Sequence, residues 1–400
     1  MNLRGACRRH VLIKITEFGP KDRGLLKRFV QFHWHHYKHH PYYVPPLNMD
    51  LLGNRLLGEK GLLTNKHPFH KHAEVVYFLA ERDGTVVGRI AGCINHRYNQ
   101  QHNAKAVIFG FWEVIDDFEV AEALLDKVAT WGKARGMTSL LGPMSFSTNE
   151  IVGVQLDAYD TLPYYETASN FPYYVDLLDR YGMRKAMDII AQKLDFTNGA
   201  ANPKLMERID KIANRMIVRN GLSTRPLDLK NIEAEKSIIR SIYNDAWKEN
   251  WGATAFTEEE FDLTADKLSV VADCGVALLG FVHDVPAAFF LILPDICDCI
   301  KTNGSIWSKF DLVRVAKLMR NKRRTRRGRV TLLGIKKPYR RSGLDAVLYR
   351  DALRHVRQTQ QFDFIEVSWL LETNSLIISA GESFAAQHYK TWRIFEKALA

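Results

Sequence analysis

The chain has 400 residues, a formal net charge of +11 and only five cysteines. This length is enough for two domains with sizeable cores, and so few cysteines, odd in number, exclude a disulfide framework. No apolar run reaches the about 18 residues of a membrane-spanning helix, and no signal-peptide core follows the first arginines. We therefore expect a cytoplasmic protein with anionic partners: nucleotide phosphates, an acidic carrier protein, nucleic acid or a membrane surface.

The first half of the chain is expected to alternate strands and helices. Alternating or continuous apolar runs predict strands, and a 3.6-residue apolar period predicts helices. A hairpin is expected around Asp83-Gly84, a pair typical of tight turns. In chain order the predicted elements are strand 11–18, helix 23–37, strands 75–81 and 86–95, strand 106–114, helix 120–135, strand 139–141, helix 171–181 and strand 189–196.

The second half repeats this order after a helix, 203–219, that joins the halves. Its predicted elements are strand 223–230, helices 232–249 and 258–268, strands 276–281 and 286–293, an insertion 294–328 with one helix near 309–320, strand 329–335, helix 343–358, strand 364–370, helix 375–386 and strand 389–396. The repeat predicts two mixed α/β domains, 1–198 and 199–400.

The most informative segment is the strand 329–335 with the turn that follows it. The apolar run breaks into a basic, glycine-containing turn, and an amphipathic helix begins at once. Backbone N–H groups and a helix N-terminus presented in this way bind phosphate, and Lys336, Lys337, Arg340 and Arg341 add positive charge. The segment predicts a pyrophosphate cradle, although a plain strand–turn–helix unit gives the same pattern.

Here the chain resembles the GNAT (GCN5-related N-acetyltransferase) superfamily, whose Gln/Arg-x-x-Gly-x-Gly/Ala turn holds acetyl-CoA. The segment Arg340-Arg-Ser-Gly343-Leu-Asp345 matches the first two anchors, whereas Asp345 replaces the final Gly or Ala. Nearly the whole chain resembles a bacterial family of tandem-GNAT proteins, on Tyr43-Val-Pro-Pro-Leu47, His72-Ala-Glu74, Phe109-Gly-Phe-Trp-Glu113, Gly142-Pro143 and Tyr181-Gly-Met183. The resemblance implies two GNAT-like domains, each a mostly antiparallel sheet with helices on both faces.

The resemblance also implies an acyl donor, acetyl-CoA or another acyl-CoA, in the second half. The expected cofactor-binding residues are Leu333, Gly334, Ile335, Arg340, Arg341, Ser342, Gly343, Leu344, Asp345 and Ala346. The corresponding turn of the first half instead carries Glu113, Asp116, Asp117 and Glu119. Carboxylates at a helix N-terminus satisfy the dipole from within the chain and repel pyrophosphate, so we expect CoA only in the second half.

Acyl transfer requires that the thioester is held, its carbonyl polarised and the attacking amine deprotonated. In GNAT relatives a splayed fourth strand exposes the N–H that polarises the carbonyl. We consider three carboxylates as general base: Glu366, Glu372 and Glu382. Glu366 shares one strand face with Ser368, and an ion pair or an exposed strand position is the alternative for it.

GNAT enzymes often use a tyrosine to protonate the departing thiolate. The first half keeps Asn170 and Tyr174 in the matching pattern, where core packing or the wall of a substrate cleft is the alternative role. The second half has Glu382 or Ser383 at that place, and Tyr389 comes too late in the chain to match directly. The expected substrate-site residues are Trp251, Ser368, Asn374, Tyr389, Asn170 and Tyr174, with a helix N-cap as the other reading of Asn374.

Two further patterns bear on partners. Histidines are dense between His33 and His72, but the one regular pair, His35 and His39, lacks neighbouring cysteines and has few carboxylates, so we expect surface histidines on a basic helix end and no metal. The basic tract 317–329 could bind RNA, a membrane headgroup or an acyl carrier protein, or form a solvated helix end. It lacks interleaved aromatic residues, which disfavours nucleic acid.

These patterns together predict an N-acyltransferase that moves an acyl group from acetyl-CoA or another thioester to a small-molecule or peptide amine. Two alternatives belong to other classes. One is a non-catalytic GNAT-fold protein that senses CoA or binds a partner. The other is a nucleic-acid-associated protein that uses the tract 317–329.

Overall fold

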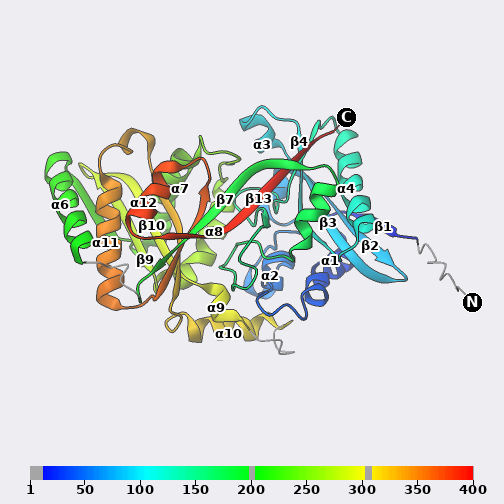
Figure 1. The fold of residues 1–400 in the computed structure, drawn as a ribbon, viewed down its shortest axis with the longest axis horizontal. Helices are drawn as coiled ribbons and strands as arrows, with labels where there is room; N and C mark the ends of the chain where they lie inside the picture. Colours follow the sequence, from blue (N-terminus) through cyan, green and yellow to red (C-terminus); the bar gives the residue numbers. More distant parts are fainter. Residues whose placement is uncertain (1–11, 198–202, 302–308, 400) are drawn as a thin grey trace, which may run out of the picture.

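The structure is a computed structural model that describes residues 12–197, 203–301 and 309–399. Its first half, at the right in Figure 1, contains the predicted strands and helices plus short added helices. The elements are β1 (Lys14–Phe18), α1 (Arg23–His36), α2 (Asn48–Leu52), β2 (Ala73–Arg82), β3 (Thr85–Asn95), α3 (His96–Gln101), β4 (Ala106–Val114), α4 (Phe118–Lys133), β5 (Ser139–Gly142), β6 (Val154–Gln155), α5 (Tyr173–Arg180) and β7 (Arg184–Asp195).

The second half has the same order of elements and lies at the left in Figure 1. Its elements are α6 (Pro203–Asn220), β8 (Leu222–Pro226), α7 (Ile232–Trp247), α8 (Glu258–Ala272), β9 (Val276–Val282), β10 (Val285–Pro294), α9 (Ile296–Ile300), α10 (Asp311–Asn321), β11 (Arg327–Ile335), α11 (Leu344–Thr359), β12 (Phe364–Leu371), α12 (Ser375–Ser383) and β13 (Gln387–Ala398). The predicted mixed α/β tandem repeat is confirmed. The predicted strand start at Val11 and the boundary between 198 and 199 lie outside the described residues.

One sheet runs through both halves because the halves exchange their last strands. The order is β1-β2-β3-β4-β5-β13-β7-β12-β11-β10-β9-β8. Strand β13 pairs with β5 of the first half, and β7 pairs with β12 of the second. The two strands cross the centre of the molecule side by side (Figure 1). The division 1–198 and 199–400 therefore describes the sequence repeat, while the sheet is shared across it.

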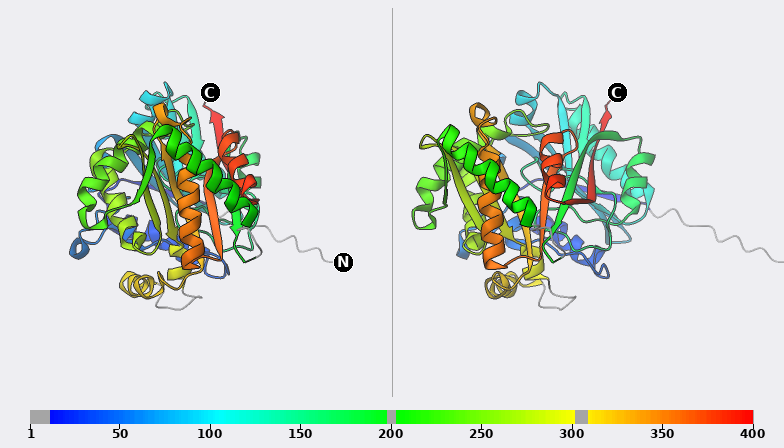
Figure 2. Two further views of the ribbon diagram at one scale, coloured as in Figure 1. Left: turned by 90° about the vertical axis from the view of Figure 1, so that its left-hand side faces the viewer. Right: turned by 60° about the vertical axis from the view of Figure 1, so that its left-hand side comes forward.

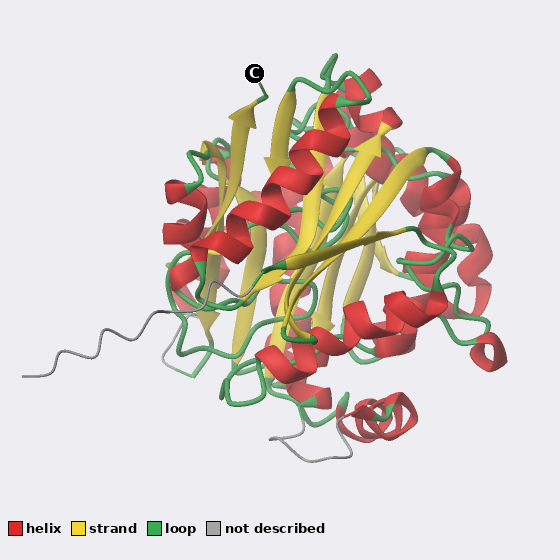
Figure 3. Ribbon diagram, turned by 90° about the vertical axis from the view of Figure 1, so that its right-hand side faces the viewer, coloured by secondary structure: helices red, strands yellow, loops and turns green. Residues whose placement is uncertain are grey.

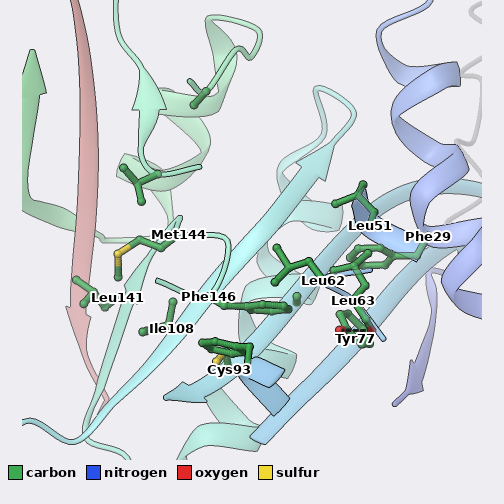
Figure 4. Close-up of a cluster of buried hydrophobic side chains, with 14 of the residues drawn as sticks. Phe29, Leu51, Leu62, Leu63, Tyr77, Cys93, Ile108, Leu141, Met144 and Phe146 are labelled. Atoms are coloured by element: carbon green, nitrogen blue, oxygen red, sulfur yellow. Dashed lines mark hydrogen bonds between the residues drawn. The ribbon is translucent and has the colours of Figure 1, made fainter. Parts of the chain in front are cut away.

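Helices cover both faces of the sheet (Figure 3). In the first half, alternate residues of β2 serve the two faces, as the two-residue period of a strand requires. Tyr77 packs in the cluster that contains Phe29 of α1, and Phe78 packs in the cluster that contains Leu124 of α4. Figure 4 shows the first cluster, in which Phe146 of the loop after β5 lies among strand residues.

The second half divides its faces in the same way. Phe290 of β10 packs in the cluster with Leu344 and Val347 of α11, and Phe289 packs with Ile242 of α7. Helix α6 lies against α11 at the end of the molecule, as both views of Figure 2 show. Among the described residues, no helix is long and apolar enough to cross a membrane.

Candidate active site

The central feature of the second half is a gap between two parallel strands. Strands β11 and β12 pair from Arg327–Phe364 to Val330–Val367. Beyond these residues β11 stays paired with β10 up to Ile335, and β12 stays paired with β7 up to Leu371. The strands therefore part, and the backbone groups of β11 that face β12 are released from pairing. The predicted splay of the fourth strand is present.

A cavity of about 660 Å³ opens where the strands part. Residues 331–335 form one wall, residues 367–371 form the opposite wall, and helices α7 and α8 contribute mostly apolar side chains. Gly334 is required here because a Cβ would lie 2.4 Å from a ring carbon of Trp247, whose indole stacks on Tyr243 with ring centroids 4.4 Å apart. The volume is within the range of small-molecule sites, about 300–1,000 Å³.

The turn after β11 has the backbone geometry of an anion cradle. Gly343 precedes α11 with φ of 83°, a left-handed conformation that side chains with a Cβ rarely adopt. The N–H groups of the first helical turn have no acceptor within the helix, and Ser342 Oγ accepts only one of them, from Leu344 at 3.3 Å. The turn thus presents a glycine and a helix N-terminus, as phosphate binding requires.

Two of the basic side chains of this turn lie close to a carboxylate of the same chain. Lys337 Nζ pairs with Glu249 at 2.6 Å, and Arg340 Nη1 lies 3.7 Å from the same carboxylate, which anchors the turn to the end of α7. Arg341 is exposed. Asp345 lies in the first turn of α11. Its carboxylate interacts favourably with the positive end of the helix dipole, which is also where a phosphate would bind.

The structure places the predicted cofactor residues in two groups. Leu333, Gly334, Ile335, Arg340 and Asp345 line the cavity, whereas Arg341, Ser342, Gly343, Leu344 and Ala346 complete the turn. A glycine turn with a free helix N-terminus beside an apolar gap is a set of groups that fits an acyl thioester.

Glu366 lies at the base of the gap in a fully connected polar network. Its side chain is buried, with no exposed surface. Ser368 Oγ donates to Glu366 Oε1 at 2.5 Å and accepts from Arg329 Nε at 2.9 Å, while the Tyr389 hydroxyl donates to Glu366 Oε2. Ser368 and Arg329 line the cavity. Glu366 therefore communicates with the cavity through the Ser368 hydroxyl.

The other two predicted carboxylates lie elsewhere. Glu372 accepts a hydrogen bond from the backbone of Asp188 at 3.0 Å and pairs with Lys185 at 2.6 Å, outside the cavity lining. Glu382 is exposed near the end of α12. The face of α12 that lines the cavity carries Leu376, Ile377 and Ala380, so it offers no proton donor there. These placements favour Glu366 among the three candidates.

The predicted substrate residues of the second half are close to the cavity. Trp251, Ser368 and Asn374 line it, and Tyr389 reaches it only through Glu366. Asn374 also caps α12, because its side-chain oxygen accepts from Ile377 N at 3.5 Å. The N-cap reading of Asn374 is therefore confirmed, and its role in substrate binding stays a prediction.

The first half has a second cavity, whose lining differs from that of the first. Asn170 Oδ1 accepts from the backbone N–H of Gln155 at 2.7 Å and so fixes a loop. Tyr174 is buried; its hydroxyl accepts from Val114 N at 3.1 Å and lies 2.9 Å from His36 Nε2. Burial raises the pKa of the Tyr174 phenol. Both residues line this second cavity of about 200 Å³, with Tyr174 committed to a buried network.

Asp117 occupies the helix end that corresponds to the phosphate turn. Its carboxylate accepts from Glu119 N at 3.0 Å and Val120 N at 3.4 Å, and it pairs with Arg82 at 2.7 Å. A protein carboxylate thus takes the place that a phosphate would take. This arrangement supports the prediction that the first half holds no CoA.

We expect Asp117→Ala to lower the free energy of unfolding by about 1 kcal/mol, because a helix loses its N-cap. The affinity for acyl-CoA should stay within twofold of the wild type. Urea unfolding and calorimetric titration measure the two quantities. A clear loss of CoA affinity would contradict the assignment of CoA to the second half.

Sequence reasoning missed a pair of acids at the junction of the two cavities. Glu166, Thr264 and Leu268 line both cavities, and Glu150 lines the second. Burial, followed by the neighbouring Glu166 charge, raises the pKa of Glu150 to about 8, and burial also raises the pKa of Glu166. Both residues sit in the irregular loop between β5 and α5, and no sequence pattern marks them.

The histidine-rich segment, residues 33–72, runs from the end of α1 to the start of β2 in the described part of the chain. No group of three or more His, Cys, Asp or Glu side chains there is placed to hold a metal ion. His33, which the sequence suggested to be at the surface, is buried, and its pKa is lowered by that burial. It packs beside Trp34 and Tyr43.

Comparison with known proteins agrees with this geometry. No family model matches the chain. The chain is 30% identical over 381 residues to the bacterial ceramide synthase of Caulobacter vibrioides (strain NA1000 / CB15N), covering 94% of this chain and 95% of that protein. It is 29% identical over 386 residues to protein YghO of Escherichia coli (strain K12), covering 94% and 93%.

Among solved structures, a tandem GNAT protein from the clavulanic acid biosynthesis pathway superposes with a TM-score of 0.55 at 12% identity, covering 97% of this chain and 99% of that chain. The repeat, the splayed strands and this superposition define a tandem GNAT fold, the fold of acyltransferases. The chain belongs to the family of tandem-GNAT proteins that contains the Caulobacter bacterial ceramide synthase and YghO. The predicted resemblance is confirmed.

Proposed function

We propose that the protein is an N-acyltransferase that transfers a long acyl group from acyl-CoA, bound in the second half, to the amine of a long-chain amino alcohol. One observation carries this proposal: the gap between β11 and β12 joins a phosphate-type turn to a large apolar cavity with a buried carboxylate network at its base. The name of the Caulobacter relative supports the acceptor class, because a ceramide is an N-acylated long-chain amino alcohol.

The strand gap holds the thioester for attack. Backbone groups of residues 331–335 flank the acyl group, and the released N–H groups of β11 polarise its carbonyl as an oxyanion hole would. The amine nitrogen forms the new bond to the carbonyl carbon, and the carbon–sulfur bond then breaks, releasing CoA. Fixing both reactants in one cavity lowers the entropic part of the barrier.

Ser368 and Glu366 take the proton of the attacking amine. Ser368 lines the cavity and its hydroxyl donates to Glu366, so it can pass a proton to the carboxylate as it receives one from the amine. Arg329 orients the hydroxyl from the other side at 2.9 Å. Such a positioned base contributes about 10²–10⁴-fold in rate.

The junction acids receive the amine on its way in. Glu166 lies on the wall of both cavities, so a chain with a cationic head can extend from one to the other past this carboxylate. The loop that carries Glu166 is also linked to β11, because Arg329 of that strand donates to the Tyr165 carbonyl at 2.5 Å. The second cavity, lined by Leu51, Leu62 and Leu263, suits the hydrocarbon part of the acceptor.

We expect acyl-chain length to govern the reaction. Each buried methylene contributes about 0.8 kcal/mol, which corresponds to about a fourfold gain in affinity. Affinity should therefore rise from acetyl-CoA through octanoyl-CoA to palmitoyl-CoA, and mass spectrometry should detect the amide of sphinganine with the long donors. Equal use of acetyl-CoA and palmitoyl-CoA would contradict the role of the apolar cavity.

The same experiment separates catalysis from sensing. Saturable binding of palmitoyl-CoA without an amide product from any long-chain amine would favour a non-catalytic CoA-binding protein. Absence of thioester binding would contradict both functions.

A further inference from the structure

The insertion between β10 and β11 presents a helix whose outer face is both apolar and cationic. Helix α10 lies at the lower edge of the molecule in Figures 1 and 2. Leu312 is 66% exposed, Val313 40% and Met319 48%. Aliphatic side chains this exposed on one helix need a covering surface or remain against water.

The exposed positions share one side of the helix. Leu312, Ala316 and Met319 follow at i, i+4 and i+7, and Val313 and Arg320 form the adjacent row. Exposed cations lie near this stripe in the chain: Lys309 before the helix, Arg320 in its last turn and Arg324 just after it, next to Arg323, which pairs with Asp273 at 2.8 Å. A helix with an apolar stripe flanked by Lys and Arg lies in the interface of an anionic membrane.

The inner side of α10 is held firmly, so the outer face is presented in a fixed direction. Leu318 is buried, and the buried Arg314 donates to the carbonyls of Pro45 and, at 2.8 Å, Pro46. Asp311 is the only acidic residue between Lys309 and Arg324. Its carboxylate accepts from Met49 N at 2.7 Å and from Asn48 N at 3.0 Å, and it is thereby turned toward the start of α2.

The attachment of α10 joins this face to the second cavity. Pro45 and Pro46, which accept from Arg314, line that cavity, and so do Cys297 and Ile300 of α9. The second cavity therefore lies on the inner side of α9 and α10, opposite the outer face of α10.

We propose that α10 is a membrane-docking helix that binds the surface of a bilayer rich in anionic phospholipids. Leu312, Val313 and Met319 enter the boundary between headgroups and acyl chains, and Lys309, Arg320 and Arg324 contact the phosphates. The exposed aliphatic stripe favours a membrane over nucleic acid, which would be held by the cations alone together with stacking aromatic residues. The proposal goes beyond acyl transfer and holds whether or not the protein is an enzyme.

Vesicle sedimentation with the full-length protein tests the proposal. The protein should sediment with vesicles of phosphatidylglycerol and phosphatidylcholine and not with phosphatidylcholine alone, and binding should weaken at 0.5 M salt, a probe condition chosen because the Debye length falls to a few Å. Leu312→Asp combined with Met319→Asp should weaken binding at least about tenfold. Arg320→Gln combined with Arg324→Gln should weaken it on the order of 20-fold, about fivefold per cation.

Val218→Asp on α6 is the matched control, since Val218 is 87% exposed on a different helix. It should bind vesicles as the wild type does, and circular dichroism should show that all variants are folded. The proposal would be overturned if the wild-type protein did not bind anionic vesicles. It would also be overturned if the Leu312→Asp/Met319→Asp protein bound them with the affinity of the wild type. Binding of single-stranded RNA that needs Arg320 and Arg324 but not Leu312, without vesicle binding, would assign the face to nucleic acid instead.

Discussion

Replacing Glu366 with Gln is expected to lower kcat about 10²–10⁴-fold while the KM for acyl-CoA changes little. The carboxylate is buried and accepts hydrogen bonds from Ser368 at 2.5 Å and from Tyr389. Glutamine keeps the size of the side chain but cannot accept the proton of the amine. The measurement is steady-state formation of the amide, with palmitoyl-CoA and sphinganine as the probes.

Ser368→Ala provides the internal check on this route. If the hydroxyl passes the proton to Glu366, the single variants should each lose a similar amount of kcat, and the double variant should be little worse than either. Residues that act as one unit are strongly non-additive in this way. Additive losses would contradict a Ser368–Glu366 relay.

Substitutions at two other carboxylates distinguish an effect on the chemical step from an effect on substrate binding. Glu372→Gln removes an acid close in sequence to Glu366, but this acid pairs with Lys185 outside the cavity and should leave kcat within threefold. Glu166→Gln should raise the KM for the amine more than it lowers kcat, because Glu166 lines the cavity junction. A kcat loss in Glu372→Gln that matches the loss in Glu366→Gln would mean that the base has been misassigned.

Local patterns in the sequence predict the parts of this fold that depend on neighbours in the chain. Strand β4 was expected at 106–114 and has those bounds, because its apolar run and the flanking polar residues define it locally. The turn at Arg340–Asp345 follows from one glycine and its charged neighbours, and the structure shows a left-handed backbone at Gly343. Short helices such as α9 were missed because five residues are too few to show a period.

Features set by partners distant in the chain could not be predicted. The exchange of β7 and β13 depends on which strand edges meet after folding. The sequence pattern of each strand is compatible with either position in the sheet. Arg329 was read as part of a charge run, yet it is buried against Ser368 and the Tyr165 carbonyl. Glu166 reaches the cavity from a loop of the other half, and only the folded arrangement brings it there.

The second large effect is expected at Gly343, where two substitutions differ only in charge. Gly343→Asp and Gly343→Asn are nearly equal in size, and Asn and Asp both tolerate the left-handed backbone that has φ of 83° here. In both, the Cβ meets the flexible side chain of Met216, whose Cγ would lie 2.6 Å away. The two substitutions should therefore disturb the turn to a similar extent. The difference between their CoA affinities then measures the effect of the added negative charge.

If the turn binds the pyrophosphate, Gly343→Asp should bind palmitoyl-CoA at least about fivefold more weakly than Gly343→Asn, because like charges a few Å apart near a surface repel by about 1–4 kcal/mol. Isothermal titration gives both affinities, and the gap should narrow at high salt, which screens the added charge. Equal affinities of the two Gly343 variants, in protein that binds the thioester, would place the phosphates away from this turn and leave only the apolar cavity to hold the donor.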